Sequence, residues 1–150
     1  MGFIGNLLWF IFGGGLLTSL MWYIGGALLA ITIIGIPFAK AAFRIARFAA
    51  LPFGKELIDG RLVGEQRIKG TGIVNFIWII FAGLGLAISH AFIGIFYCCT
   101  VIGIPFGMAH LKLAKVSFAP LGKTVVSSAV AKEAIQRAAK SELDAKLEKK

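Results

Sequence analysis

Two long stretches of this sequence contain no charged residue. Neither 1–39 nor 70–111 includes an Asp, Glu, Lys or Arg. A soluble domain rarely has even about 18 such residues in a row, because its surface helices need a polar face. With 58% of the residues hydrophobic, this lack of charge excludes an ordinary soluble domain. The chain is therefore expected to be a membrane protein.

The groups that catalysis needs are also scarce. There are two histidines, His90 and His110, and all seven Asp and Glu residues lie outside the uncharged stretches. Cys98 and Cys99 are adjacent, which fits neither a structural disulfide nor a Cys-x-x-Cys metal or redox site. We predict no enzymatic activity, no catalytic or metal-binding residues and no cofactor. The missing membrane carboxylates also disfavour a cation-coupled transporter that acts alone.

The basic residues are confined to two segments. The net charge is +9, and all sixteen Lys and Arg residues lie in 40–69 and 112–150. Each segment directly follows an uncharged stretch, as the cytoplasmic loops of membrane proteins do. The positive charge therefore indicates topology, and we predict no nucleic-acid partner.

The sequence contains an internal duplication. A shift of 69 residues superimposes two Asn-x-x-Trp segments, 6–9 and 75–78, and a shift of 68 superimposes 32–38 on 100–106. The second pair reads Thr-Ile-Ile-Gly-Ile-Pro-Phe and Thr-Val-Ile-Gly-Ile-Pro-Phe. Hydrophobic bias alone does not produce matched Asn, Trp and Pro residues in the same order.

The repeats predict an all-α membrane protein made of two tandem hydrophobic helical hairpins. One helix needs about 20 residues to cross a hydrocarbon core about 30 Å thick, and each uncharged stretch is about twice that length. Basic segments on both sides of the second stretch require an even number of crossings. We predict about four transmembrane helices with both termini in the cytoplasm. The alternative is one long helix plus a re-entrant half-helix in each repeat.

The outer turns of these hairpins are predicted near 18–23 and 88–92. At these turns, polar and aromatic side chains are expected to reach water. They are Ser19, Trp22, Tyr23, Ser89 and His90.

The duplicated membrane domain is predicted over 1–126, with repeats at about 3–57 and 72–126. The linker between the repeats includes Asp59-Gly60, a turn pair that is typical of a β-hairpin. The remaining 127–150 is rich in Ala, Lys and Glu. Its oppositely charged residues four positions apart predict a cytoplasmic C-terminal helix.

A proline interrupts the second hydrophobic arm of each repeat. Because proline lacks a backbone N–H, it leaves the carbonyl groups of Ile33 and Val101 without their helical partners. Inside a membrane such groups need protein or water partners. The break either lines a cavity or pore or is a kink near the membrane surface, and both interpretations stay open. The residues concerned are Thr32, Gly35, Pro37, Thr100, Gly103 and Pro105.

Basic residues follow each break on one face of a predicted amphipathic helix. Helices of this kind lie in the membrane interface, where each Lys or Arg near anionic headgroups contributes about 1 kcal/mol. Membrane lipids are therefore expected partners, together with further copies of the chain or another membrane protein. The predicted headgroup contacts are Lys40, Arg44, Arg47, Lys112 and Lys115.

The doubled Asn-x-x-Trp, Thr-x-Ile-Gly-Ile-Pro-Phe and Pro-x-Gly-Lys segments resemble the YccF family of bacterial inner-membrane proteins. The resemblance covers about residues 3–126. It implies an inner-membrane location and a duplicated architecture, but no particular reaction or active site. Gly107 follows the second Gly-Ile-Pro-Phe segment whereas Ala39 follows the first, so a role that requires glycine there is not expected in the first repeat.

Three functions are consistent with this sequence. The first is a homo-oligomeric pore or another transport-related component, because glycine-rich helix faces permit close helix packing. The second is an accessory or scaffold subunit of a larger membrane complex. The third is a sensor of the lipid surface that uses the basic helices.

Overall fold

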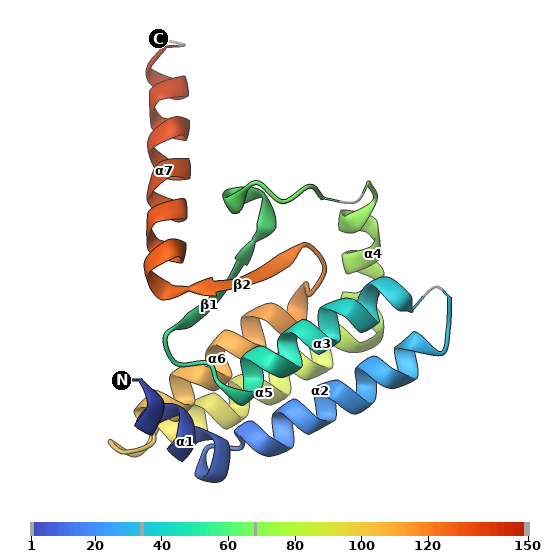
Figure 1. The fold of residues 1–150 in the computed structure, drawn as a ribbon, viewed down its shortest axis with the longest axis vertical. Coiled ribbons are helices and arrows are strands. Elements are labelled where there is room, and N and C mark those ends of the chain that lie inside the picture. Colours follow the sequence, from blue (N-terminus) through green and yellow to red (C-terminus); the bar gives the residue numbers. More distant parts are fainter. Residues whose placement is uncertain (1, 34, 68, 149–150) are drawn as a thin grey trace.

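The computed structural model describes residues 2–33, 35–67 and 69–148. Each repeat has the same series of elements: a short helix, a long helix, a returning helix and a strand (Figure 1). In the first repeat these are α1 (Phe3–Phe12), α2 (Gly15–Ala30), α3 (Ile36–Ala50) and β1 (Lys55–Asp59). In the second they are α4 (Thr71–Trp78), α5 (Leu84–Cys98), α6 (Ile104–Phe118) and β2 (Lys123–Ser127).

Three further elements complete the described chain. A 3₁₀ helix, η1 (Gly60–Val63), follows β1, and a π-helical turn, η2 (Ile79–Gly83), joins α4 to α5. The predicted C-terminal helix is α7 (Ser128–Leu147), with ion pairs four residues apart between Glu133 and Arg137 and between Glu142 and Lys146. Residues 149–150 of the predicted tail lie outside the described residues.

The hairpin of each repeat turns at the Gly-Ile-Pro segment. Pro37 and Pro105 lie in the first turn of α3 and α6, where a backbone N–H would have no helical partner. The predicted outer turns at 18–23 and 88–92 are wrong, because both segments lie inside the long helices α2 and α5. Neither segment contains a Gly or Pro to end a helix. Most of the side chains expected to reach water there are instead buried, among them Ser19, Trp22 and His90.

The short helices join the long helices differently in the two repeats. Gly14 adopts a left-handed φ of 82° between α1 and α2, which are bent by 72°. The equivalent Gly83 has an ordinary φ of −60°, and the helix continues through η2. Among the described residues, Thr71–Cys98 is the one helix long and apolar enough to cross a membrane, and the bent α1–α2 pair is a second only if it forms one span. Helix length therefore does not supply the four predicted crossings.

The strands of the two repeats pair with each other. β1 and β2 are antiparallel, and Leu57 lies opposite Val125. These two residues are equivalent under the 68-residue shift, so the pairing is centred on a pseudo-twofold axis that relates the repeats. The hairpin predicted at Asp59-Gly60 does not form, because the chain there enters η1 and β1 finds its partner in the other repeat.

The elements form three layers (Figure 1). The long uncharged helices α2 and α5 make the lowest layer, α3 and α6 the middle layer, and the β-ribbon with the linker and α7 the upper layer, or cap. The core lies around the middle layer, where Ile45, Ala46 and Leu113 are buried. The predicted amphipathic segments are therefore helices, but they are sandwiched inside the molecule.

Candidate functional site

The repeated asparagines fasten the start of each repeat to its end. The Asn6 side chain donates to the Phe53 carbonyl (3.1 Å) and accepts from the Phe53 N–H (3.0 Å). Asn75 makes the same two bonds with Leu121, both at 3.1 Å. The doubled Asn therefore has a structural role in both copies.

The repeated tryptophans fasten the two repeats to each other. The Trp9 indole donates to the Ala49 carbonyl (2.6 Å), and the Trp78 indole donates to that of Ser117 (2.8 Å). Each indole also packs on the phenylalanine of the Gly-Ile-Pro-Phe segment of the other repeat. The pairs are Trp9 with Phe106 at 6.1 Å and Trp78 with Phe38 at 5.1 Å between ring centroids.

The six residues of the two predicted breaks form matching turns. The hydroxyls of Thr32 and Thr100 accept the N–H groups of Gly35 and Gly103 at 3.0 Å, and they donate to carbonyls of the preceding helix. A Cβ at either glycine would overlap a backbone carbonyl oxygen of that helix. The turns lie at opposite ends of the bundle (Figure 1), so within one copy they do not line a common cavity.

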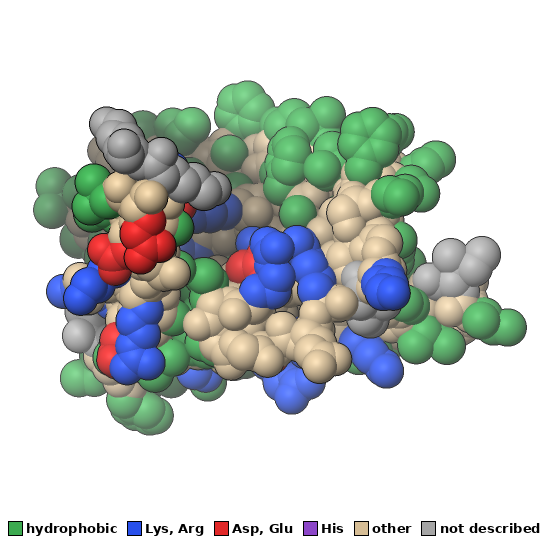
Figure 2. Space-filling model, turned by 90° about the horizontal axis from the view of Figure 1, so that it is seen from above, with side chains coloured by type: hydrophobic (Ala, Val, Ile, Leu, Met, Phe, Trp, Pro, Cys, Tyr) green, Lys and Arg blue, Asp and Glu red, His purple; other side chains and the backbone are tan. Residues whose placement is uncertain are grey.

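A basic groove lies between the first half of α3, the linker and the start of α4. It is a hollow of about 240 Å³ in the face that carries the cap. Figure 2 shows Lys and Arg side chains gathered over the centre of this face and hydrophobic side chains around its edge. Ile36 and Ile73, next in the chain to lining residues, are exposed. The charged residues of the lining are Lys40, Arg44, Glu65, Arg67 and Lys69.

Two of the four cations in the basic groove are held by the protein. Arg44 donates to a carbonyl of β2 and lies 4.0 Å from Glu65, and Arg67 lies 3.8 Å from the Asp59 carboxylate. Within the described chain, neither lysine of the groove belongs to an ion pair. Four cations against one carboxylate favour an anionic ligand, and a phosphate group has the matching chemistry.

Asp59 fixes one wall of this groove. Its carboxylate accepts two hydrogen bonds from the Arg61 side chain, at 3.1 and 3.0 Å. These bonds, with the nearby positive charge of Arg67, lower the pKa of Asp59 to about 2. The carboxylate therefore stays ionised at physiological pH and holds Arg67 beside the groove.

The second repeat has an equivalent of this groove, here called the twin groove. Met108 takes the place of Lys40, and Lys112 takes the place of Arg44. Lys112 is paired with Glu56 at 2.5 Å, and no linker residue lines the hollow. The twin groove is therefore apolar and close to neutral. Its lining is Pro52, Phe53, Ile104, Pro105, Met108, Ala109 and Lys112.

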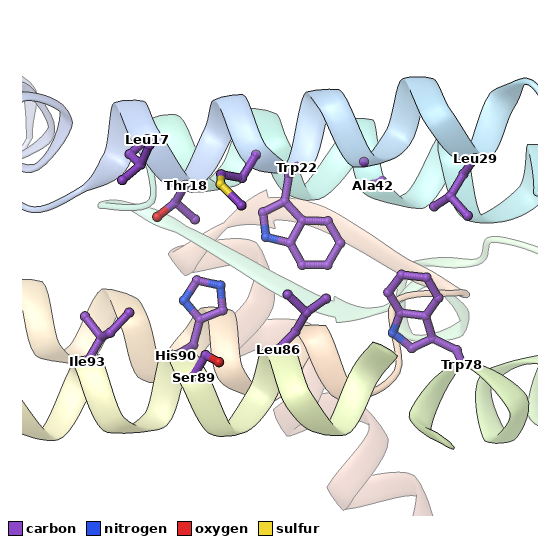
Figure 3. Close-up of a pocket in the computed structure, with 12 residues that line it drawn as sticks. Leu17, Thr18, Trp22, Leu29, Ala42, Trp78, Leu86, Ser89, His90 and Ile93 are labelled. Carbon is purple, nitrogen blue, oxygen red and sulfur yellow. The ribbon is translucent and has the colours of Figure 1, made fainter. Parts of the chain in front are cut away.

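A cavity of about 390 Å³ separates α2 from α5. Figure 3 shows Trp22 of α2 and Leu86 and His90 of α5 projecting into it. Most of its lining is aliphatic or aromatic, so the cavity fits an apolar group better than a hydrated ion. Its polar side chains besides the indoles are Thr18, Ser89 and His90.

The two histidines bond to each other. The Nδ1 atoms of His90 and His110 are 3.1 Å apart, so one ring donates and the other accepts. His110 packs against Trp9 and stacks on Tyr97, whose hydroxyl donates to the Phe12 carbonyl. The pair joins α5 and α6 to the end of α1, and His90 is not at a water-exposed turn as predicted.

The predicted headgroup residues fall into three groups. Lys40 and Arg44 line the basic groove, Lys112 lines the twin groove, and Arg47 and Lys115 are exposed on α3 and α6. Sequence reasoning did not single out Arg67 and Lys69. They reach the groove from an irregular linker, where no periodic pattern indicates the direction of a side chain.

Comparisons with known proteins agree with the duplicated organisation of the chain. The family profile described as inner membrane component domain, YccF, matches the chain twice, at residues 4–55 and 73–123, which confirms the duplication. The chain is 32% identical over 134 residues to Inner membrane protein YccF of Escherichia coli (strain K12), covering 86% of this chain and 90% of that protein. The Shigella flexneri protein of the same name gives the same figures. No solved structure matches the chain.

Proposed function

The chain belongs to the YccF family of inner membrane components. On this premise we propose that it is a non-catalytic lipid-binding component, and that its basic groove holds the phosphate of an anionic headgroup. The observation that supports this proposal most is the contrast between the two equivalent grooves. The basic groove has four cations, whereas the twin groove has a single lysine, which is paired. Lys40 has the apolar Met108 as its equivalent, and Arg67 and Lys69 come from the linker, which the twin groove lacks. The positive charge is therefore concentrated in one hollow, and it points to a ligand there.

The position of the groove supports a lipid as the source of that phosphate. Ile36 and Ile73 are exposed beside the lining, so apolar surface and positive charge meet at the groove. An amphiphile has this combination of an anionic head and an apolar body. Lysines that are free of ion pairs contribute most to such binding, because no carboxylate has to be displaced.

The test compares binding of phosphatidylglycerol and phosphatidylcholine by native mass spectrometry of the full chain in detergent. Lys40→Met and Lys69→Met should each weaken the preference for phosphatidylglycerol about fivefold, and the double variant about 25-fold, at about 1 kcal/mol per charge. Lys132→Met with Lys140→Met on α7 removes the same charge far from the groove and should change nothing. An unchanged preference in the groove double variant would refute the proposal.

A homo-oligomeric pore, the first function expected from the sequence, is the second candidate. The cavity between α2 and α5 is the feature closest to a conduit, but its mostly apolar lining favours a lipid chain over an ion. Conductance by the purified protein in planar bilayers would favour the pore over the lipid-binding component. An accessory role would instead show as a membrane protein that co-purifies in a fixed ratio.

A further inference from the structure

All charged side chains of the described structure lie on one side of the long helices. α1, α2, α4, η2 and α5 contain no Asp, Glu, Lys or Arg. In the middle layer, Arg44 bonds to a β2 carbonyl and Lys112 to Glu56 of β1, so both side chains are turned towards the cap. The opposite faces of α3 and α6 pack on Gly26 of α2 and Gly94 of α5. The molecule is therefore uncharged at one end of its layer stack and charged at the other.

The long helices lie across the axis that relates the repeats. In Figure 3, α2 runs from Leu17 to Leu29 in the direction opposite to α5. A twofold axis reverses only directions that are perpendicular to it. The axis between Leu57 and Val125 therefore runs from the cap to the uncharged layer, and α2 and α5 lie crosswise to it.

This geometry decides between two orientations in a bilayer. If α5 stood along the membrane normal, the axis would lie in the membrane plane and the charged cap would face hydrocarbon at mid-depth. Each such charge costs about 2.5–3.5 kcal/mol at the centre of the bilayer. If the axis lies along the normal instead, the cap stays in water and only uncharged helices enter the lipid.

We infer that the protein inserts into one leaflet only, the cytoplasmic one, with α2 and α5 lying in the membrane plane against the acyl chains. α1 has 10 residues, or about 15 Å of length, which is half of a hydrocarbon core about 30 Å thick. It leads into the leaflet and then bends by 72° into α2. The surface that meets the acyl chains is apolar: Met21 is 65% exposed and Phe92 70% exposed.

The basic residues of the cap-bearing face identify the leaflet. Figure 2 shows Lys and Arg side chains on the cap-bearing face, which single-leaflet insertion places at the level of the headgroups. Anionic lipids and the positive-inside rule both place such a basic face at the cytoplasmic side of the membrane. Single-leaflet insertion keeps both termini in the cytoplasm and replaces the multi-pass arrangement expected from sequence.

The test measures the depth of nitroxide labels in vesicles of phosphatidylcholine and phosphatidylglycerol, from collisions with oxygen and a nickel chelate. Labels are attached to single cysteines in a Cys98→Ala, Cys99→Ala background, at exposed sites on one face of each helix. The three α5 labels should lie at one depth, whereas the α1 labels should deepen by about 1.5 Å per residue. The sites are Leu84, Ile88 and Ile95 on α5 and Ile4, Leu8 and Ile11 on α1.

A depth gradient of about 1.5 Å per residue along α5, passing through the bilayer centre, would overturn the inference. Reaction of Phe92→Cys with an impermeant maleimide from the periplasmic side would overturn it as well. Shallow labels on both helices would also contradict it, because the chain would then only rest on the surface. The Lys40→Met variant tests headgroup binding, and its label depths should equal those of the unchanged protein. A loss of lipid preference and a loss of insertion are therefore separate outcomes.

Discussion

In the second repeat His110 fills the space beside Trp9, whereas in the first repeat the equivalent Ala42 lines an open cavity next to Trp78. The two grooves differ in the same manner, with Lys40 in one and Met108 in the other. The paired Asn and Trp bonds are the same in both repeats. The duplicated bonds therefore build the frame, and a few unmatched side chains determine which hollows it contains.

The largest expected difference between the repeats concerns the two tryptophans. Trp9 is 0% exposed, whereas Trp78 is half-buried beside the cavity. Trp9→Ala should lower the free energy of unfolding by about 3–5 kcal/mol, as expected for a fully packed aromatic residue. Trp78→Ala should cost roughly half as much, because part of its surroundings is already empty. Denaturant unfolding in detergent measures both, and equal losses would contradict the asymmetric packing.

A smaller effect is expected where α1 meets α2. A Cβ at Gly13 would lie 2.6 Å from the Trp9 ring, whereas the equivalent residue of the second repeat is Ala82. Gly13→Ala should lower the free energy of unfolding by about 1–3 kcal/mol through overpacking. The reverse change, Ala82→Gly, should cost about 1 kcal/mol or less. If the two changes cost the same in thermal unfolding, the bend is not held by this contact.

One substitution makes the two grooves more alike. Met108→Lys gives the twin groove the lysine of the basic groove, and it should raise phosphatidylglycerol binding there by about fivefold, or about 1 kcal/mol. Native mass spectrometry should then detect a second bound phosphatidylglycerol. If Met108→Lys adds no lipid, charge alone does not explain the contrast between the grooves.

The smallest effect concerns Asp59, which belongs to the first repeat's side of the cap. Its folded-state pKa of about 2 is below the unfolded value of 3.8, so its stabilisation is complete above pH 3.8 and is lost as the pH falls towards 2. Contact with water limits this contribution to about 1 kcal/mol or less. The difference in unfolding free energy between wild type and Asp59→Asn should shrink over this range. A difference that persists unchanged at pH 2 would rule out the charge as its cause.

The duplication and the helical tail could be predicted from the sequence, because ordered matches and charge pairs four residues apart are local signals. The positions of the hairpin turns could not be found by dividing each apolar stretch in half. The stronger signal was the Thr-x-x-Gly-Ile-Pro segment itself. There Gly35 makes room for a carbonyl oxygen and Pro37 starts the next helix, but this segment was interpreted as a break near the end of an arm.

The cap and the groove depend on contacts between distant segments. β1 and β2 are five residues long each, and nothing in either strand specifies a partner in the other repeat. The groove needs that pairing, because it brings the linker over α3 and places Arg67 beside Lys40. Sequence periodicity therefore identified the basic residues of the helices, but it did not identify the basic residues of the linker that line the same groove.

The central claim is that a pseudo-twofold axis between Leu57 and Val125 relates the repeats. It is tested by oxidising Leu57→Cys with Val125→Cys in membranes, in the Cys98→Ala, Cys99→Ala background. Directly opposed strand residues have Cβ atoms about 4.5–5.5 Å apart, so this pair should cross-link within one chain. Leu57→Cys with Thr124→Cys places the thiols on opposite faces of the ribbon and should not. Equal cross-linking of the two pairs, or of the second pair alone, would contradict the axis.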